Sequence, residues 1–378
     1  MRTIYYLISV IIFLSSCNEG NKKRYTLEYN SKNLSFILDN NTKNLIYTLQ
    51  PYYEINGNEY LSFQSGHKNE ILIYNIKNKQ LEFKISPEIE GGDGVGFFLG
   101  YYLHNLDSIF LTNKDIQEIA LVDKNSKLKD KIQYDETNKG ETLTHSYSIT
   151  SYYEPIKIIE NKMYIISGCN RWVEKDPVSV TIDLNSKEVK SLPFYYPNFK
   201  EANNNAKKGG MEEYFSRDFD GENFIYSFFF DENIFVTNMD HTSIKKIKIK
   251  SEYINKVKLL DDYGNLTPED ACSNPNYGNL IYDKYRNVYY RIAYPKTEIE
   301  KGVRGLELRS YGRKLFSIII LDKNFNIIGE TLFPKYTYNS NLLFIHKDGL
   351  YISDSHYLNP EFSDDVLSFK CFKLTKNR

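Results

Sequence analysis

Residues 342–353 read Leu-Leu-Phe-Ile-His-Lys-Asp-Gly-Leu-Tyr-Ile-Ser, two short apolar runs on either side of a turn. Asp348-Gly349 suits that turn, because tight β-hairpins need positive φ angles, which Gly, Asn and Asp tolerate. Five similar hairpins precede it, with second strands that begin near residues 60, 108, 163, 224 and 288. Amphipathic helical patterns are scarce by comparison. The sequence therefore predicts an all-β fold built on a repeated hairpin.

A second hairpin follows each of the first five. These second hairpins cover residues 70–84, 119–129, 180–189, 234–245 and 318–328. Each unit thus has four antiparallel strands, and the units follow one another at roughly 50–65 residues, a spacing typical of propeller blades.

The sixth unit lacks a fourth strand. Its third strand, residues 367–374, is followed only by Thr-Lys-Asn-Arg, whereas a spare strand-like segment, residues 24–29, precedes the first unit. An N-terminal strand in the vacant position would close the ring and remove an exposed sheet edge. We therefore expect a six-bladed β-propeller of four-stranded antiparallel blades, closed by an N-terminal strand, as a single domain over residues 24–378. Two stacked β-sandwiches and an irregular β-solenoid are the alternatives.

Composition limits the function classes. The length of 378 residues by itself suggests two or three domains, and the repeat replaces these with one ring. Hydrophobic residues make up 41% and charged residues 26%, which excludes wholesale disorder. The chain has 48 Lys and Arg against 49 Asp and Glu, and this balance disfavours a nucleic-acid-binding protein, which normally has a strongly basic face.

The N-terminus has the pattern of an export signal. Arg2 precedes an apolar run from Ile4 to Leu14, and Leu-Ser-Ser-Cys at residues 14–17 leads into polar residues. The position of Cys17 resembles a bacterial lipobox, which implies cleavage before Cys17 and diacylation of its sulfur. We expect residues 1–16 to be a signal peptide and residues 17–23 a lipidated tether. The protein would then be anchored to the outer membrane, on its periplasmic or surface face. The alternative is a plain signal peptide with an incidental cysteine.

Three cysteines remain in the mature chain: Cys169, Cys272 and Cys371. None lies in a C-x-x-C pair, so the sequence gives no support for a structural zinc site or a thioredoxin-like site. A Cys169–Cys272 disulfide is conceivable, and three reduced, buried thiols are the alternative.

Loop length singles out one face of the predicted disc. The turns within hairpins are short, whereas inserted sequence lies after the fourth strands and between the second and third strands. These two loop classes share one face, because alternate loops of a four-stranded blade emerge on opposite sides. Long loops on a rigid scaffold are where binding and catalysis concentrate.

Five residues are candidates for ligand binding. Arg171 and Trp172 lie in the insertion at residues 168–178, and such a pair suits a sugar ring, an aromatic ligand or a protein hot spot. Arg304 and Arg309, with Arg313, recur in the insertion at residues 295–314 and could bind an anion. Arg217, in the first strand of the fourth unit, is the fifth candidate. The alternatives are a packed loop anchor for Trp172 and a solvated charged loop for the arginines.

Other motifs are weaker. The glycine-rich stretch at residues 90–96 could cradle a phosphate, but it lacks the Lys-Ser/Thr of a P-loop and favours a tight structural crossing. Asp261-Asp262 and Glu269-Asp270 could help to bind calcium, although no EF-hand loop is present. The sequence has no H-E-x-x-H motif and no G-x-S-x-G elbow, so it indicates no catalytic residue, no metal and no cofactor.

Three stretches carry a family resemblance: Glu-Gly-Gly-Asp-Gly-Val-Gly at 90–96, Asn-Leu-Asp-Ser-Ile-Phe at 105–110, and Tyr-Asp-Lys-Tyr-Arg-Asn-Val-Tyr-Tyr-Arg at 282–291. With them, nearly the whole mature chain resembles an uncharacterised family of Bacteroidota lipoproteins, that of domain of unknown function 4221. Position 92 is more often Pro in that family. The resemblance implies a lipoprotein with a six-bladed, TolB-like propeller body, and it implies no activity.

The sequence thus favours a non-enzymatic binding or scaffolding module, whose partner is an envelope protein, a peptide or a glycan. A glycan hydrolase or lyase with carboxylates in the funnel is one alternative. A cluster of acids about 5–10 Å apart would favour that enzyme. The other alternative is a ligand sensor paired with a membrane protein.

Overall fold

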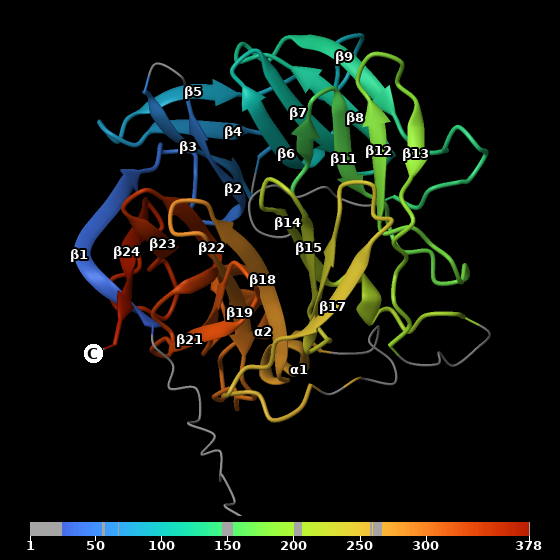
Figure 1. Ribbon diagram of the computed structural model, residues 1–378. Helices are drawn as coiled ribbons and strands as arrows, with labels where there is room; N and C mark the ends of the chain where they lie inside the picture. The colour runs from blue at the N-terminus through green and yellow to red at the C-terminus, as the bar shows by residue number, and fades with distance from the viewer. Residues whose placement is uncertain are drawn as a thin grey trace, which may run out of the picture.

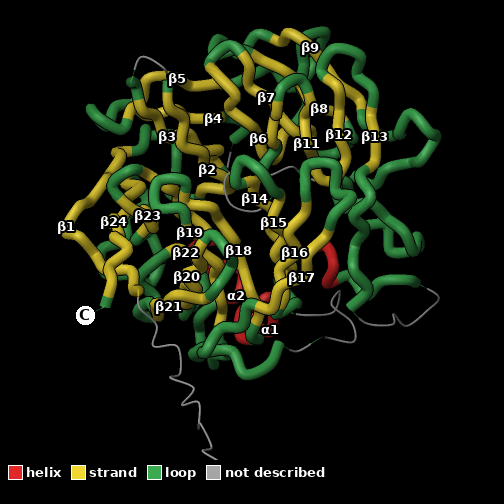
Figure 2. Tube along the Cα trace, in the orientation of Figure 1, coloured by secondary structure: helices red, strands yellow, loops and turns green. Residues whose placement is uncertain are grey.

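The computed structural model describes residues 25–54, 57–66, 68–145, 154–199, 206–257, 259 and 267–377. The expected signal peptide, Cys17 and the tether lie outside these residues. The fold is all-β, and small antiparallel sheets stand around a common centre in a propeller-like arrangement (Figures 1 and 2).

Four sheets have four strands each, and the strands of each sheet follow one another in chain order. The first sheet consists of β2 (Ile46–Tyr53), β3 (Glu59–Ser65), β4 (Ile71–Asn75) and β5 (Leu81–Ile85), and the second of β6 (Phe98–Asn105), β7 (Ser108–Asn113), β8 (Glu118–Val122) and β9 (Leu128–Gln133). The third consists of β10 (Lys157–Ile159), β11 (Lys162–Ile166), β12 (Ser179–Asp183) and β13 (Val189–Ser191), and the fourth of β14 (Phe215–Phe219), β15 (Phe224–Phe228), β16 (Asn233–Thr237) and β17 (Ile244–Lys248).

The fifth sheet has eight strands in the order β18-β19-β20-β21-β1-β24-β23-β22. One half consists of β18 (Asn276–Asp283), β19 (Val288–Tyr294), β20 (Ser317–Asp322) and β21 (Ile327–Leu332), and the other of β22 (Asn339–His346), β23 (Gly349–Ser353), β24 (Val366–Lys376) and β1 (Tyr25–Ile37). A single parallel register pair, Tyr25 with Gly329, joins the two halves. The sequence did not predict this junction. It forms because Gly329 has no side chain, whereas a Cβ at that position would lie 2.0 Å from the Tyr25 carbonyl oxygen.

The N-terminal strand takes the place that the sequence analysis assigned to it. β1 pairs antiparallel with β24, from Tyr25 opposite Lys376 to Ile37 opposite Val366. β2 contacts both β6 and β22, so the first and last hairpins of the chain are neighbours at the centre. Every strand-like run identified in the sequence overlaps one of the observed strands.

A polar residue at the end of the third strand fixes the turn that follows. Its side-chain oxygen accepts a hydrogen bond from a main-chain N–H within the turn, which replaces a backbone partner and favours the tight reversal. The residues in this position are Asn75, Asp123, Asp183, Asn238 and Asp322.

Within the described residues, three short helices interrupt the connections that the sequence analysis treated as loops. They are η1 (Met211–Glu213), α1 (Pro268–Ser273) and α2 (Gly305–Tyr311). Thr267 begins α1 by accepting a hydrogen bond from the Asp270 N–H at 3.1 Å, and α1 contacts α2. None of the helices in the described part of the chain has the length and apolar character needed to cross a membrane.

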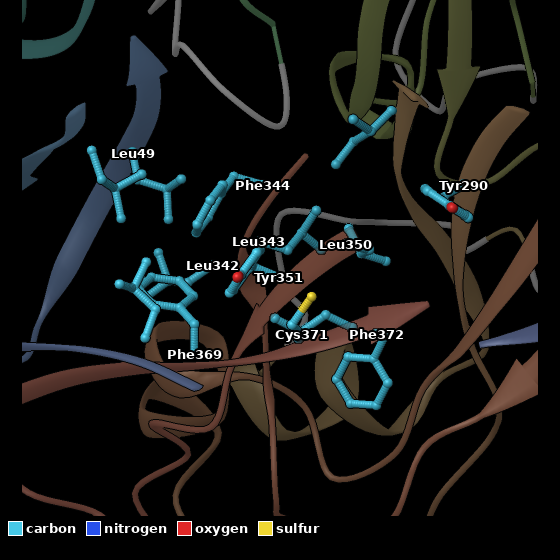
Figure 3. Packing of buried hydrophobic residues seen from close by; sticks show 14 of the residues in the cluster. Leu49, Tyr290, Leu342, Leu343, Phe344, Leu350, Tyr351, Phe369, Cys371 and Phe372 are labelled. Carbon is cyan, nitrogen blue, oxygen red and sulfur yellow. The ribbon is translucent and has the colours of Figure 1, made fainter. Parts of the chain in front are cut away.

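Apolar side chains fill the spaces between neighbouring sheets. One cluster joins Ile73 of the first sheet to Tyr101 of the second, and similar clusters lie between each following pair of sheets. The cluster in Figure 3 joins Leu49 of the first sheet to Phe344 and Phe369 of the fifth, where the two ends of the chain meet. Burial of these side chains is the main force that holds the sheets side by side.

Two fully buried arginines add polar links between sheets. Arg217 on β14 donates to carbonyl oxygens of the third sheet, including that of Tyr164 at 3.1 Å. Arg291 on β19 donates to four carbonyl oxygens of the fourth sheet and its connections, the shortest contact being 2.6 Å to Asp231, and to the Ser227 hydroxyl. Its guanidinium also lies 3.7 Å from the centre of the Tyr277 ring.

The run at residues 282–291, which carries the family resemblance, forms the β18–β19 hairpin and contacts elements on both sides. Arg291 links it to the fourth sheet, as described above. Arg286 donates to the carbonyl oxygens of His346 at 2.8 Å and Lys347 at 3.1 Å, in the β22–β23 hairpin. The two arginines of this run therefore have an architectural role.

Candidate functional site

A cavity of about 630 Å³ opens where the long connections converge. Its walls come from seven segments far apart in sequence, represented by His145, Cys169, Tyr196, Phe229, Ala271, Arg309 and Asn341. These residues belong to, or border, the connections β9–β10, β11–β12, β13–β14, β15–β16, β17–β18, β19–β20 and β21–β22. Every second connection from β9–β10 to β21–β22 thus contributes to, or borders, one cavity.

The alternation explains why these segments meet. Antiparallel strands reverse direction at each connection, so alternate connections lie on the same side of the sheets. A second cavity, of about 390 Å³, lies at the hairpin ends of the central strands, with Pro51, Tyr102, Asp218, Ile281 and Phe344 in its wall. The larger cavity therefore lies on the long-loop face and the smaller one on the hairpin face.

One wall of the larger cavity carries two carboxyl groups, those of Glu154 and Glu213. Burial raises the pKa of Glu154 to about 8; the nearby charge of Arg217 lowers it and that of Glu213 raises it. Burial also raises the pKa of Glu213, while Arg171, whose Nε lies 3.3 Å from the Glu213 Oε1, lowers it. At neutral pH the Glu154 carboxyl is therefore mainly protonated, and the Glu213 charge has a partner.

Another part of the lining carries two arginines, Arg309 on α2 and Arg313 just after it. Arg313 donates to the Asn276 Oδ1 at 2.8 Å, and its guanidinium lies 4.3 Å from the centre of the Tyr294 ring. Both residues with which it interacts also line the cavity. The cavity thus has an acidic wall from the third and fourth sheets and a basic wall from the fifth.

The predicted pair Arg171 and Trp172 lies beside this site. Arg171 reaches it indirectly, through its ion pair with Glu213. Trp172 is 66% exposed and does not line the cavity. Its main-chain N–H donates to the Asn170 Oδ1 at 3.0 Å, which fixes the loop but leaves the indole in solvent. The alternative from the sequence, in which Trp172 packs against the sheets as a loop anchor, is therefore wrong.

The three other predicted residues have different surroundings. Arg309 is exposed and lines the cavity. Arg304 begins α2, is exposed, and pairs with Glu307 at 3.4 Å, outside the cavity wall. Arg217 is buried and does not line the cavity, and its two terminal guanidinium nitrogens donate to main-chain carbonyls and to the Ser179 hydroxyl of the third sheet.

Several minor motifs have structural explanations. Cys169, Cys272 and Cys371 are free and buried, so Cys169 and Cys272 are not joined. In the glycine-rich stretch, Gly91 and Gly96 have φ angles of 90° and 71°, which makes it a tight crossing. Of the acids considered for calcium, Glu269 accepts a hydrogen bond from the Gly305 N–H and Asp270 belongs to the α1 cap. Asp261 and Asp262 lie outside the described residues.

Sequence reasoning missed Glu154 and Glu213 as site residues. Both lie at the end of a long inserted loop, directly before a first strand. That shared position at the mouth of the ring was a usable signal, because the start of each central strand faces the long-loop side. Nothing local distinguished these acids from the surface acids elsewhere in the chain.

Comparisons with known proteins agree with the architecture. The sequence pattern of DUF4221, a domain of unknown function, matches residues 24–332. A crystal structure of a DUF4221 member from Bacteroides vulgatus ATCC 8482 is 27% identical with a TM-score of 0.80, covering 94% of this chain and 99% of that chain. A structure from Bacteroides fragilis NCTC 9343 is 10% identical with a TM-score of 0.53, covering 95% and 98%. No protein with a curated description matches the sequence. The chain belongs to the DUF4221 family.

Proposed function

We propose that this protein is a lipid-anchored binding or scaffolding module of the cell envelope, and that its long-loop face takes an envelope protein, a peptide or a glycan. The observation that carries the proposal is the cavity of about 630 Å³ on that face, to which seven connections contribute. A concave site with aromatic walls and a few convergent polar groups is the usual form of a ligand site. A sensor that reports its ligand to a membrane protein would use the same cavity.

We further propose that the eight-stranded sheet counts as two blades, which makes the ring a six-bladed propeller over residues 24–378. The smaller cavity supports this count, because its wall takes residues from β2, β6, β10, β14, β18 and β22, the first strand of each unit. The two halves of the eight-stranded sheet are joined by one register pair, Tyr25 with Gly329, and by hydrogen bonds of Thr26 and Leu27 to the Thr331 hydroxyl beside it, so their junction is short.

The proposed anchor agrees with the direction of β1. Tyr25 pairs with Gly329, close to the β20–β21 turn on the hairpin face, whereas Ile37 at the other end of β1 leads toward β2 on the long-loop face. A lipid on Cys17 would therefore attach on the hairpin side. Residues 18–24 span at most about 25 Å when extended. The large cavity would then face away from the membrane, accessible to a partner.

Replacing Cys17 with Ala is expected to leave the protein in the periplasm without a lipid. Fractionation of the native organism, or metabolic labelling with a palmitate analogue, measures the result. The unaltered chain should partition into the outer membrane and incorporate the label. If Cys17→Ala still partitions into membranes, lipid anchoring through this cysteine is wrong.

Filling the cavity should abolish binding. Ala271 is half-buried in the cavity wall, and Ala271→Trp adds a large side chain without removing a polar contact. The full-length acylated protein, solubilised in detergent, should first be tested on a glycan array and in a pull-down from its own envelope. We expect Ala271→Trp to weaken any such interaction at least tenfold.

Met239→Trp is the matched control, because Met239 is 41% exposed in the β16–β17 turn on the opposite face. This variant should bind as the wild type does. If Ala271→Trp leaves every detected interaction intact, the cavity is not the binding site and the proposal fails.

A glycan hydrolase or lyase is the second candidate, because Glu154 and Glu213 line one cavity and Glu154 is mainly protonated at neutral pH. Glycoside hydrolysis uses two carboxyl groups, one of which is protonated and acts as the general acid. Incubation of bound glycans with the protein distinguishes the two functions. Cleavage products that disappear in both Glu154→Gln and Glu213→Gln would favour the enzyme, and intact glycans would favour the binding module.

A further inference from the structure

We infer that the large cavity takes an acidic saccharide, of the uronic-acid class, whose carboxylate is held by Arg309 and Arg313. This inference rests on the proposed function, because it names the ligand class of the same cavity. It depends on the charges of the two walls, on the way α2 is fixed, and on the polar and aromatic groups between them.

The two arginines leave positive charge in the cavity. Among the described residues, neither guanidinium has a carboxylate within 4.0 Å, whereas those of Arg171 and Arg304 do. Arg313 is half-buried, and it donates to the Asn276 amide oxygen and to the Asn274 main-chain carbonyl, both of which are neutral. Two like charges in one wall repel each other, and an anion between them would relieve that repulsion. The planar guanidinium favours planar carboxylates, which it can bind through two parallel hydrogen bonds.

The helix that carries Arg309 is fixed before any ligand arrives. The Asn341 Nδ2 donates to the Arg309 carbonyl oxygen at 2.8 Å, and the Asn339 Nδ2 donates to that of Ser310 at 3.3 Å. At the other end of α2, a Cβ on Gly305 would lie 2.4 Å from the Glu269 nitrogen, so Gly305 permits the close approach of α1. A fixed backbone reduces the entropy lost on binding, which favours a specific site over a mobile charged loop.

The acidic wall, formed by Glu154 and Glu213, limits which polar groups the rest of the ligand can carry. A free ammonium group, as in an amino acid or a peptide N-terminus, would need an unpaired carboxylate. Burial keeps Glu154 mainly protonated at neutral pH, and Glu213 already pairs with Arg171. A protonated carboxyl and a paired carboxylate can instead exchange hydrogen bonds with hydroxyl groups. The wall therefore favours a hydroxyl-rich ligand over a zwitterionic one.

Aromatic and amide side chains complete the lining. Tyr214 and Phe229 are half-buried in the cavity wall, and Asn276 and Asn341 contribute amides. Aromatic faces pack against the apolar C–H faces of sugar rings, and amides bind sugar hydroxyls. A volume of about 630 Å³ falls within the usual range for small-ligand sites, which matches one or two sugar rings rather than a long chain.

The test uses calorimetry on the full-length protein with defined disaccharides. The probes are digalacturonate and diglucuronate, the corresponding neutral hexose disaccharides, and an acidic dipeptide. We expect the uronates to bind and the neutral sugars to bind at least tenfold more weakly. Arg309→Gln should weaken uronate binding at least tenfold and leave the affinity for neutral sugars unchanged. Arg309→Lys keeps the charge but not the planar guanidinium, so its affinity for uronates should lie between those of the wild type and Arg309→Gln.

Arg304→Gln is the matched control, since Arg304 lies in the same insertion, is exposed and does not line the cavity. It should bind uronates as the wild type does. The inference is overturned if neither uronate binds, if neutral sugars bind equally well, if Arg309→Gln has no effect, or if the dipeptide binds better than the uronates. Binding of another ligand that Ala271→Trp abolishes would leave the proposed function intact, whereas binding unaffected by Ala271→Trp would contradict both.

Discussion

Arg291→Ala is expected to lower the free energy of unfolding by about 4 kcal/mol or more. The guanidinium is completely buried and donates to main-chain carbonyls that include those of Asp231 and Ile249, at 2.6 and 2.8 Å. Without it, buried acceptors between the fourth sheet and β19 lose their donor, and each unsatisfied group costs about 1–3 kcal/mol. The Tyr277 ring also loses the cation that lies 3.7 Å from its centre. Urea denaturation followed by tyrosine fluorescence measures the change.

Two further variants separate the contribution of the planar Arg291 guanidinium from the effect of removing any arginine. Arg291→Lys keeps a positive charge but cannot reach several carbonyls at once, so it should recover only part of the loss. Arg304→Ala removes an exposed arginine and should change the unfolding free energy by less than about 0.5 kcal/mol. An Arg291→Ala protein as stable as the Arg304→Ala protein would show that the buried arginine does not hold the sheets together.

Glu154→Gln is expected to change how stability depends on pH. The ordinary pKa of this carboxyl is 4.5, and burial raises the pKa in the folded protein to about 8. Below pH 4.5 both states are protonated. Between pH 4.5 and pH 8 the folded state keeps a proton that the unfolded state releases. The stabilisation is therefore fully present in acid and is lost as the pH rises through 8, by at most about 1.4 kcal/mol for each pH unit.

Glutamine has no such titration, so Glu154→Gln should equal the wild type near pH 4 and exceed it by about 2–4 kcal/mol at pH 8. Unfolding free energies measured at five or six pH values give the difference curve, in which the titrations of all other groups cancel. Glu174→Gln, an exposed acid of the neighbouring loop, is the control and should show a flat difference. Parallel curves for Glu154→Gln and the wild type would contradict the raised pKa.

The strands could be predicted because their signals are local. The run at residues 342–353 contains both the two apolar stretches and the Asp-Gly turn that make a hairpin, and these act over a few residues. Chain order then placed alternate connections on one face, and the missing fourth strand pointed to β1 as the partner of β24. The joining of β1 to β21 could not be predicted, because it depends on contacts between residues about 304 positions apart in the chain, such as the close approach of Tyr25 to Gly329.

The site was predicted less completely than the fold. Arg309, predicted from its place in a long insertion, lines the cavity, whereas Arg217, predicted with it, has a buried side chain outside the lining. The sequence shows that an arginine lies in a strand-like run or in an inserted segment. It does not show whether the side chain meets solvent, a ligand or the carbonyls of the next sheet, because that depends on how neighbouring sheets pack.

By itself, the sequence determined the strands, their order, the N-terminal strand that pairs with β24 and the face that carries the long connections, because apolar runs, turn residues and chain order specify these within or between adjacent segments. Only the tertiary structure decided that Glu154, Glu213, Arg309 and Arg313 line one cavity. These residues come from connections up to about 160 positions apart. They meet because packing of the sheets around a common centre brings the starts of the first strands and their connections together.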